Sequence, residues 1–173
     1  KPLQLQNIFV SKEHNGMVDQ PQYLTPEGLK NLESRLKHLT EVRRAEIAER
    51  LRQALEEGGD LSENAEYEDA KNEQAFVEGE IMRLETILSN AQVIEATGKS
   101  DKVVLGAQVT VIEEGTKEAE VYTLVGSAEA NPRDGKISSE SPLGKALLGV
   151  KAGEKVKVNT PDGSITYLVK KIG

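Results

Sequence analysis

The chain has 173 residues, a length that allows one large domain or two small ones. It contains no cysteine, which excludes disulfide frameworks, thiol catalysis, and cysteine-ligated zinc or iron–sulfur sites. Two histidines, 3% aromatic residues and a net charge of −7 argue against a histidine metal site, a base-stacking surface and a freestanding nucleic-acid binder. No apolar run approaches the roughly 18 residues of a membrane span, so we expect no membrane association.

The first segment, residues 1–22, has no sustained periodicity and lacks the order of basic, apolar and small residues that marks a signal peptide. Met17 resembles a natural start, so residues 1–16 are interpreted as an upstream extension. We predict an extension or flexible N-terminus over residues 1–22. The lack of a signal and of cysteine predicts a cytoplasmic protein.

The negative charge is concentrated in one part of the chain. Residues 26–92 carry 9 basic and 16 acidic residues, whereas residues 93–173 carry 11 of each. Within the acidic part, residues 56–69 hold seven acids and neither lysine nor arginine. Such a run is usually the solvated face of a helix, so charge alone does not define a site here.

A long helix is predicted to begin at Thr25-Pro26-Glu27, where a capping residue precedes proline and an acid. Apolar residues then recur at spacings of three and four, interrupted by an eleven-residue step that predicts local unwinding of a supercoil. The stripe consists of Leu29, Leu32, Leu36, Leu39, Ile47, Leu51 and Leu55. We expect this helix to end at Gly58-Gly59.

A second helix is predicted from a stripe that keeps regular three- and four-residue spacing. Its members are Tyr67, Ala70, Gln74, Val77, Ile81, Leu84, Leu88 and Ala91. Two such helices joined by a short glycine turn can bury their stripes only against each other. About 30 residues per helix give an arm roughly 45–50 Å long. Residues 23–92 are therefore predicted to form a protruding antiparallel coiled-coil hairpin with an acidic tip.

Asp60 and Glu63 at the predicted tip allow two interpretations. Asp-x-x-Glu at a helix start is typical of a capping box, with Asp60 as N-cap and Glu63 three residues later. The same carboxylates suit Mg²⁺, which takes one or two carboxylates and completes its shell with water and phosphate oxygens. Because such a pair binds metal weakly, the remaining ligands would come from a partner's active site. The two interpretations are compatible.

From Val93 onward the pattern becomes strand-like. Strands are predicted over 108–112, 120–125, 155–159 and 164–169, a hairpin turn at Pro161-Asp162-Gly163, and one short helix over 142–148. Residues 93–173 are therefore predicted to form a small antiparallel sheet with one helix, which makes the whole chain α+β. No catalytic constellation is evident there, and Asp101, Glu113 and Glu114 are interpreted as surface acids.

Three blocks in order along the chain resemble the Gre family of bacterial transcript cleavage factors, and its GreA branch most closely. The first is Gly59-Asp60-Leu61-Ser62-Glu63-Asn64-Ala65-Glu66-Tyr67, followed by Ala70-Lys71 and Gln74. The others are Leu88-Ser89-Asn90-Ala91 and Ser141-Pro142-Leu143-Gly144-Lys145-Ala146-Leu147-Leu148-Gly149. The resemblance covers about residues 23–173 in one register.

The resemblance implies a prolyl-isomerase-like fold in the C-terminal domain, which docks on RNA polymerase beside its secondary channel. It places the polymerase-docking surface at Ser141, Pro142, Leu143 and Gly144, although these residues also suit an ordinary helix entry. The coiled coil then enters the channel, and Lys71 contacts the nascent RNA 3′ end. Alternatively, Lys71 pairs with Glu68 or Asp69 on its own helix. DNA binding is implied only through the family.

By the same resemblance, Asp60 and Glu63 help the polymerase to hold a second Mg²⁺ and to orient the water that cleaves backtracked RNA. Ser62 supports them or acts as a local cap. The protein itself would be no enzyme, a monomer when free, with no tightly bound cofactor. Glu56-Glu57 replaces an arginine that many relatives carry before the tip, which weakens any basic patch and suits short backtracks.

Three rival functions keep parts of this fold. A Gre-like regulator would occupy the channel and inhibit or modulate polymerase without promoting cleavage, but its tip would depart from the paired acids. A coiled-coil adaptor would leave the tip and the second domain without a role. An independent hydrolase is the least supported, because two carboxylates without a third catalytic group form an incomplete site.

Overall fold

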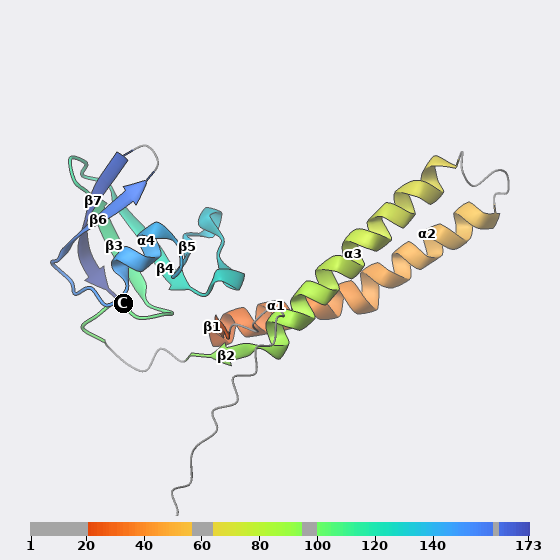
Figure 1. Ribbon diagram of the computed structural model, residues 1–173, viewed down its shortest axis with the longest axis horizontal. Coiled ribbons are helices and arrows are strands. Elements are labelled where there is room, and N and C mark those ends of the chain that lie inside the picture. Colours follow the sequence, from red (N-terminus) through yellow and green to blue (C-terminus); the bar gives the residue numbers. More distant parts are fainter. Residues whose placement is uncertain (1–20, 57–63, 95–99, 161–162) are drawn as a thin grey trace, which may run out of the picture.

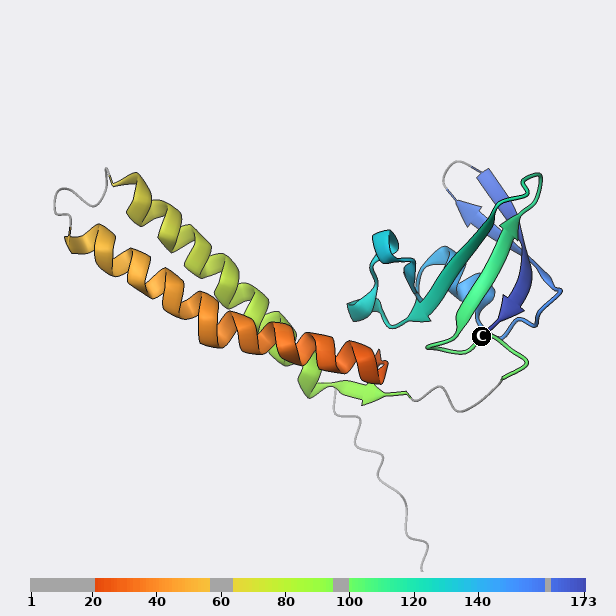
Figure 2. The same ribbon diagram turned by 180° about the vertical axis from the view of Figure 1, so that it is seen from behind.

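The computed structural model describes residues 21–56, 64–94, 100–160 and 163–173. It is a mixed α/β protein in which a long pair of helices extends away from a domain built on a curled β-sheet (Figures 1 and 2). This confirms the predicted mixture of a helical half and a sheet half. Within the described ranges, no helix is long and apolar enough to cross a membrane.

The first side of the arm is a continuous helical rod of three parts: α1 (Pro26–His38), a π-helical turn η1 (Leu39–Arg43) and α2 (Arg44–Glu56). Its predicted start is confirmed, because the Thr25 hydroxyl accepts a hydrogen bond from the Gly28 amide, 3.0 Å away. The wide turn is closed by the Arg44 amide, which donates to the Leu39 carbonyl five residues back. It falls where the apolar spacing changes between Leu39 and Ile47.

The second side is α3 (Ala65–Ser89), which lies beside α2 and runs in the opposite direction (Figure 1). The buried residues between the helices form a cluster of Ile47, Val77 and Ile81, with Leu36, Leu39 and Leu51 packed against it. Both apolar stripes are therefore confirmed over most of their length. That the two helices form a coiled coil in the strict sense stays a prediction.

Two stripe positions were predicted wrongly. Leu55 is 51% exposed, and the neighbouring Ala54 is buried in its place at 1%. Gln74 is exposed, whereas Glu73 is half-buried and contacts Arg43 of η1 and Arg50 of α2. Near its end the arm is thus held by a small residue and by ion pairs rather than by a continuous row of leucines.

The base of the arm contains a parallel pair of short strands, β1 (Gln22–Leu24) and β2 (Ala91–Val93). Because α3 ends at Ser89, Ala91 belongs to a strand and not to the second helix as expected. Leu24 is fully buried at this point. β1 crosses the predicted domain boundary between residues 22 and 23, and β2 crosses the one between residues 92 and 93.

The second half contains a five-stranded sheet in the order β5-β4-β3-β7-β6. Its strands are β3 (Gln108–Glu113), β4 (Ala119–Val125), β5 (Lys136–Ser138), β6 (Lys155–Thr160) and β7 (Gly163–Ile172). All four predicted strands are present. The sheet is not purely antiparallel, because β5 pairs with β4 in parallel after two 3-10 turns, η3 (Ser127–Glu129) and η4 (Pro132–Asp134).

The core of this half lies between the sheet and the short helix α4 (Pro142–Leu147), whose position was predicted correctly. The most deeply buried members are Val103, Val109, Val111, Leu124, Leu147 and Val169. β6 and β7 pair as far as Thr160 and Gly163, which confirms the predicted hairpin, while its turn residues 161–162 lie outside the described residues. The prolyl-isomerase-like classification stays a prediction.

Candidate functional site at the end of the helical arm

The predicted site residues Asp60, Ser62 and Glu63 lie outside the described residues, as does the expected helix end at Gly58-Gly59. The described residues on either side are Glu56, which ends α2, and Asn64, which precedes α3. Both are at the end of the arm farthest from the sheet (Figures 1 and 2). By connectivity, the predicted acids belong to the link between the two helices at that end.

Asn64 joins the ends of both arm helices. Its side-chain oxygen Oδ1 accepts a hydrogen bond from the Tyr67 amide at 3.2 Å, which makes it the N-cap of α3. Its Nδ2 group donates to the carbonyl oxygen of Ala54 on α2, also at 3.2 Å. Asn64 therefore holds the N-cap position of α3, while the capping interpretation of Asp60 and Glu63, which lie outside the described residues, stays a prediction.

Farther from the end of the arm than Asn64, ion pairs link α3 to η1 and α2. The Glu73 carboxylate on α3 accepts hydrogen bonds from both Arg43 and Arg50. Arg44 forms a two-pronged pair with Glu78, with N–O distances of 2.7 and 2.5 Å. Hydrogen bonding from Arg44 lowers the pKa of Glu78. These contacts fix the two helices side by side along the outer half of the arm.

Arg52, the arginine nearest the end of α2, pairs within its own helix. It donates hydrogen bonds to Glu49 and to Glu56. Hydrogen bonds from Arg52 and Gln53 lower the pKa of Glu49 to about 2. Since Arg43, Arg44 and Arg50 also have carboxylate partners, the arginines of the π turn and α2 are neutralised locally, and the end of the arm keeps its negative character.

Lys71 differs from these arginines. It is exposed near the start of α3 and forms no ion pair within the described part of the chain. The expectation that Lys71 pairs with Glu68 or Asp69 is therefore wrong in this structure. Because no other described residue neutralises it, the Lys71 ammonium group would suit a phosphate ligand from elsewhere.

The predicted docking residues Ser141, Pro142, Leu143 and Gly144 form the first turn of α4. The Ser141 hydroxyl accepts from the Gly144 amide at 3.0 Å and donates to the Ser138 carbonyl at 2.7 Å. Pro142 is exposed, Leu143 is half-buried against the core, and Gly144 is buried. The helix-entry interpretation is confirmed, and Pro142 is the residue of this group with the most surface to offer a partner.

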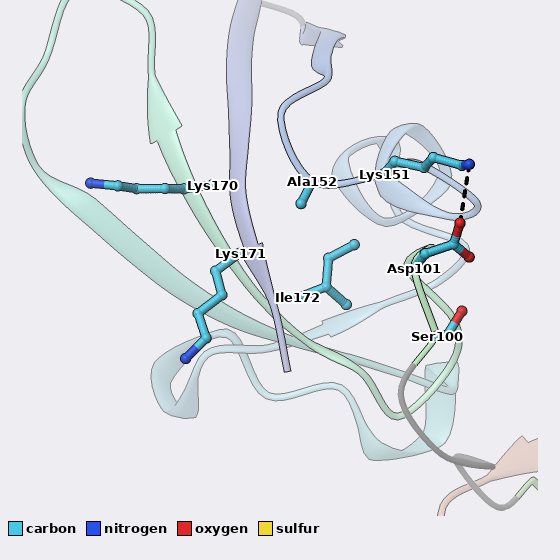
Figure 3. A pocket seen from close by; sticks show the side chains of 7 residues that line it. All are labelled: Ser100, Asp101, Lys151, Ala152, Lys170, Lys171 and Ile172. Carbon is cyan, nitrogen blue, oxygen red and sulfur yellow. Dashed lines mark ion pairs between the residues drawn. The ribbon is translucent and has the colours of Figure 1, made fainter.

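A cavity of about 370 Å³ on the sheet half is bordered by Asp101, Lys151, Lys170 and Lys171. Lys151 pairs with Asp101 at 3.0 Å, and the side chains of Lys170 and Lys171 point away from that pair (Figure 3). The cations do not converge, so the cavity has no anion site. Asp101 is a surface acid as predicted.

Within the described ranges, no cluster of three or more His, Asp or Glu side chains is able to hold a metal ion. Asp60 and Glu63 are of the carboxylate type that Mg²⁺ accepts, but two ligands leave its octahedral shell incomplete. Any Mg²⁺ held by these two residues would need ligands from another molecule.

Comparison with known proteins identifies the family. A family model described as "Transcription elongation factor, N-terminal" matches residues 22–93, and one described as "Transcription elongation factor, GreA/GreB, C-term" matches residues 98–173. Together the two matches define a transcription elongation factor. The chain belongs to the GreA/GreB family, which confirms the resemblance found in its sequence.

Named relatives agree with this assignment. The chain is 52% identical over 156 residues to transcription elongation factor GreA of Caldanaerobacter subterraneus, covering 90% of this chain and 99% of that protein. It is 50% identical over 157 residues to that of Chloroflexus aurantiacus, with the same coverage. It is also similar to the solved structure of GreA factor homolog 1 of Thermus thermophilus, at 32% identity and a TM-score of 0.41, covering 89% of this chain and 99% of that one.

Proposed function

We propose that this protein is a transcript cleavage factor that binds RNA polymerase and rescues arrested complexes. Its helical arm enters the secondary channel, and the tip stimulates the polymerase's own cleavage of backtracked RNA. The observation that carries the proposal is the Asn64 junction, which caps α3 and contacts α2 and so holds together the ends of the two helices that flank the acidic link. Asp60 and Glu63 belong to that link by sequence, and in this proposal they serve a ligand. Membership of the GreA/GreB family supports the same function.

The chemistry required of the tip is modest. Mg²⁺ held in the polymerase active centre stabilises the charge that develops on the phosphodiester and activates water. Asp60 and Glu63 contribute carboxylate oxygens toward a second such ion and orient the attacking water, with the Ser62 hydroxyl in the same hydrogen-bond network. Lys71 contacts a phosphate of the extruded RNA. The acidic link thus supplies groups that the polymerase site lacks.

The protein acts in this scheme as a donor of side chains and not as an enzyme. Two carboxylates are too few to bind Mg²⁺ firmly, so the free protein should hydrolyse no RNA. The sheet half docks on the rim of the channel through the first turn of α4, with Pro142 outermost. The expected partner is RNA polymerase, and the free protein is expected to be a monomer in the cytoplasm.

The test is a cleavage assay on stalled, backtracked polymerase with Mg²⁺. The unaltered chain is compared with Asp60→Asn and Glu63→Gln, which remove one charge each with little change of shape. Glu66→Gln is the matched control, because Glu66 lies in the first turn of α3 on its exposed face. The proposal predicts stimulated cleavage that the first two substitutions abolish and the control retains, with polymerase binding unchanged. Binding without stimulated cleavage by the unaltered chain would instead indicate a regulator that only occupies the channel.

A further inference from the structure

The arm and the sheet half meet at a specific joint. The carboxylate of Glu129, in the η3 turn of the sheet half, accepts two hydrogen bonds from Thr25 at the start of α1. One comes from the Thr25 amide to Oε1 and the other from the Thr25 hydroxyl to Oε2, both at 2.6 Å. The same hydroxyl accepts from the Gly28 amide. A side chain 104 positions away in sequence thus completes the cap of the arm's first helix.

The joint is shaped to admit this carboxylate. A Cβ at Gly28 would lie 1.8 Å from the Glu129 side chain, so only glycine lets the carboxylate lie against α1. On the opposite side, a Cβ at Gly126 would lie 1.8 Å from the Tyr23 carbonyl oxygen. Neither glycine has a backbone conformation that requires glycine, since neither has a positive φ. Close approach of the two halves is therefore the reason for the absence of a side chain at both positions.

An ion pair lies beside these hydrogen bonds. Lys136, at the start of β5, contacts Glu27 in the first turn of α1 at 3.0 Å. The Lys136 side chain is 27% exposed, whereas that of Glu27 is 73% exposed. This pair is more open to water than the contacts of Glu129, so the Glu129 carboxylate is the stronger determinant of the joint.

We propose that Glu129 is a positioning residue that fixes the direction of the arm relative to the sheet half. The proposal rests on the function proposed above, because a rigid joint matters when one half docks and the other must deliver a tip at a distance. Small angular freedom at the base becomes a large displacement at the far end of a long arm. Holding the joint closed keeps the tip in the orientation in which it can enter the channel.

The geometry is tested first in the free protein. Because the chain has no cysteine, Ser34→Cys on α1 and Lys157→Cys on β6 place two spin labels cleanly, one in each half. Their distance distribution is measured by double electron–electron resonance in full-length protein. Glu129→Gln should broaden or shift the distribution, because an amide NH₂ cannot accept the hydrogen bond that Oε2 accepts. Glu118→Gln, at an exposed acid of the sheet half that pairs with no other described residue, should not.

Two further variants distinguish an effect on the joint from a loss of fold stability. Thr25→Ser keeps both donors and should give the wild-type distribution. Gly28→Ala leaves Glu129 intact but displaces its carboxylate, so it should open the joint although alanine is the better helix former. Retained helix content with a changed label distance would assign the effect to the joint and not to unfolding.

The same variants are then assayed for stimulated cleavage. Glu129→Gln and Gly28→Ala should raise the protein concentration for half-maximal cleavage by roughly tenfold, as the competent orientation becomes a minor population. The maximal rate at saturation should change much less, since the tip itself is unaltered. An unchanged label distribution and an unchanged half-maximal concentration in both variants would overturn the proposal. If the unaltered protein stimulates no cleavage, the proposed function fails instead, and the label distances still decide the joint.

Discussion

Asn64 and Ala54 connect the two arm helices at the last described turn before the acidic link: the Asn64 Nδ2 group donates to the Ala54 carbonyl oxygen at 3.2 Å. The same side chain caps α3 through its Oδ1 atom. Asn64 thus joins the end of α2 to the start of α3 and also caps α3. This places the ends of α2 and α3 next to each other and gives the link between them a fixed base.

The two roles of Asn64 can be separated by substitution. Asn64→Asp keeps the oxygen that caps α3 but removes the donor to Ala54, whereas Asn64→Ala removes both. We expect Asn64→Ala to lower the free energy of unfolding by about 1 kcal/mol, and Asn64→Asp to lower it less. Urea unfolding followed by circular dichroism measures this. Amide exchange at Tyr67 should speed up only in Asn64→Ala, and equal exchange in both variants would contradict the assignment of the cap.

Glu73 should matter more for the arm than other surface acids. It contacts both Arg43 and Arg50, and its side chain is only 25% exposed. Glu73→Gln should cost roughly 1–2 kcal/mol of unfolding free energy, because two arginines lose their charged partner at a partly buried position. Glu33→Gln, at an exposed position of α1, is the control. Urea unfolding of both variants gives the comparison, and equal midpoints would show that the contact contributes nothing.

Acid should weaken the arm. Hydrogen bonds from Arg44 lower the pKa of Glu78, and those from Arg52 lower the pKa of Glu49 to about 2. A carboxyl with a lowered pKa in the folded state stabilises it above the ordinary value of 4.5, and this contribution is lost as pH falls toward the folded-state value. Urea midpoints should therefore decline between about pH 5 and pH 2.

The acid dependence has its own control. Glu78→Gln cannot titrate, so its urea midpoint should start lower at neutral pH and change less as pH falls. High salt should reduce the difference between the two proteins, because the pair is exposed. Parallel pH curves for the unaltered chain and Glu78→Gln would contradict the role given to this pair.

Gly144 is expected to be intolerant of any side chain. A Cβ at this position would lie 1.9 Å from the carbonyl oxygen of Ser138, a backbone atom that cannot turn aside. Gly144→Ala should destabilise the sheet half by roughly 1–3 kcal/mol through overpacking. Gly149→Ala meets no atom within 4 Å but has a φ of +81°, so its cost should be conformational and smaller. Thermal unfolding of the two variants distinguishes crowding from backbone strain.

Local signals in the sequence predicted much of this fold. Thr25-Pro26 marked the start of α1, and alternation of β-branched residues marked four of the sheet strands. The three-residue strands β1, β2 and β5 were missed, because so few residues carry no periodicity and their pairing is parallel and non-local. The π turn was indicated only as a change of spacing.

The site was harder to predict than the fold. Asp60, Ser62 and Asn64 are all good N-cap residues in close succession, so the sequence alone could not assign the cap to Asn64. Glu73 and Gln74 are adjacent, and only the partners on the facing helix decide which one points inward. Glu129 gave no local signal, because its partner Thr25 is distant in sequence. The roles of Asp60 and Glu63 stay a prediction.

The most direct test of the central claim is the Mg²⁺ dependence of stimulated cleavage. If Asp60 and Glu63 supply ligands for a metal ion, the unaltered protein should lower the Mg²⁺ concentration for half-maximal cleavage by backtracked polymerase. Asp60→Asn should return that concentration toward the value for polymerase alone, and excess Mg²⁺ should partly restore its rate. An unaltered protein and an Asp60→Asn variant with the same Mg²⁺ dependence would contradict metal ligation by the tip.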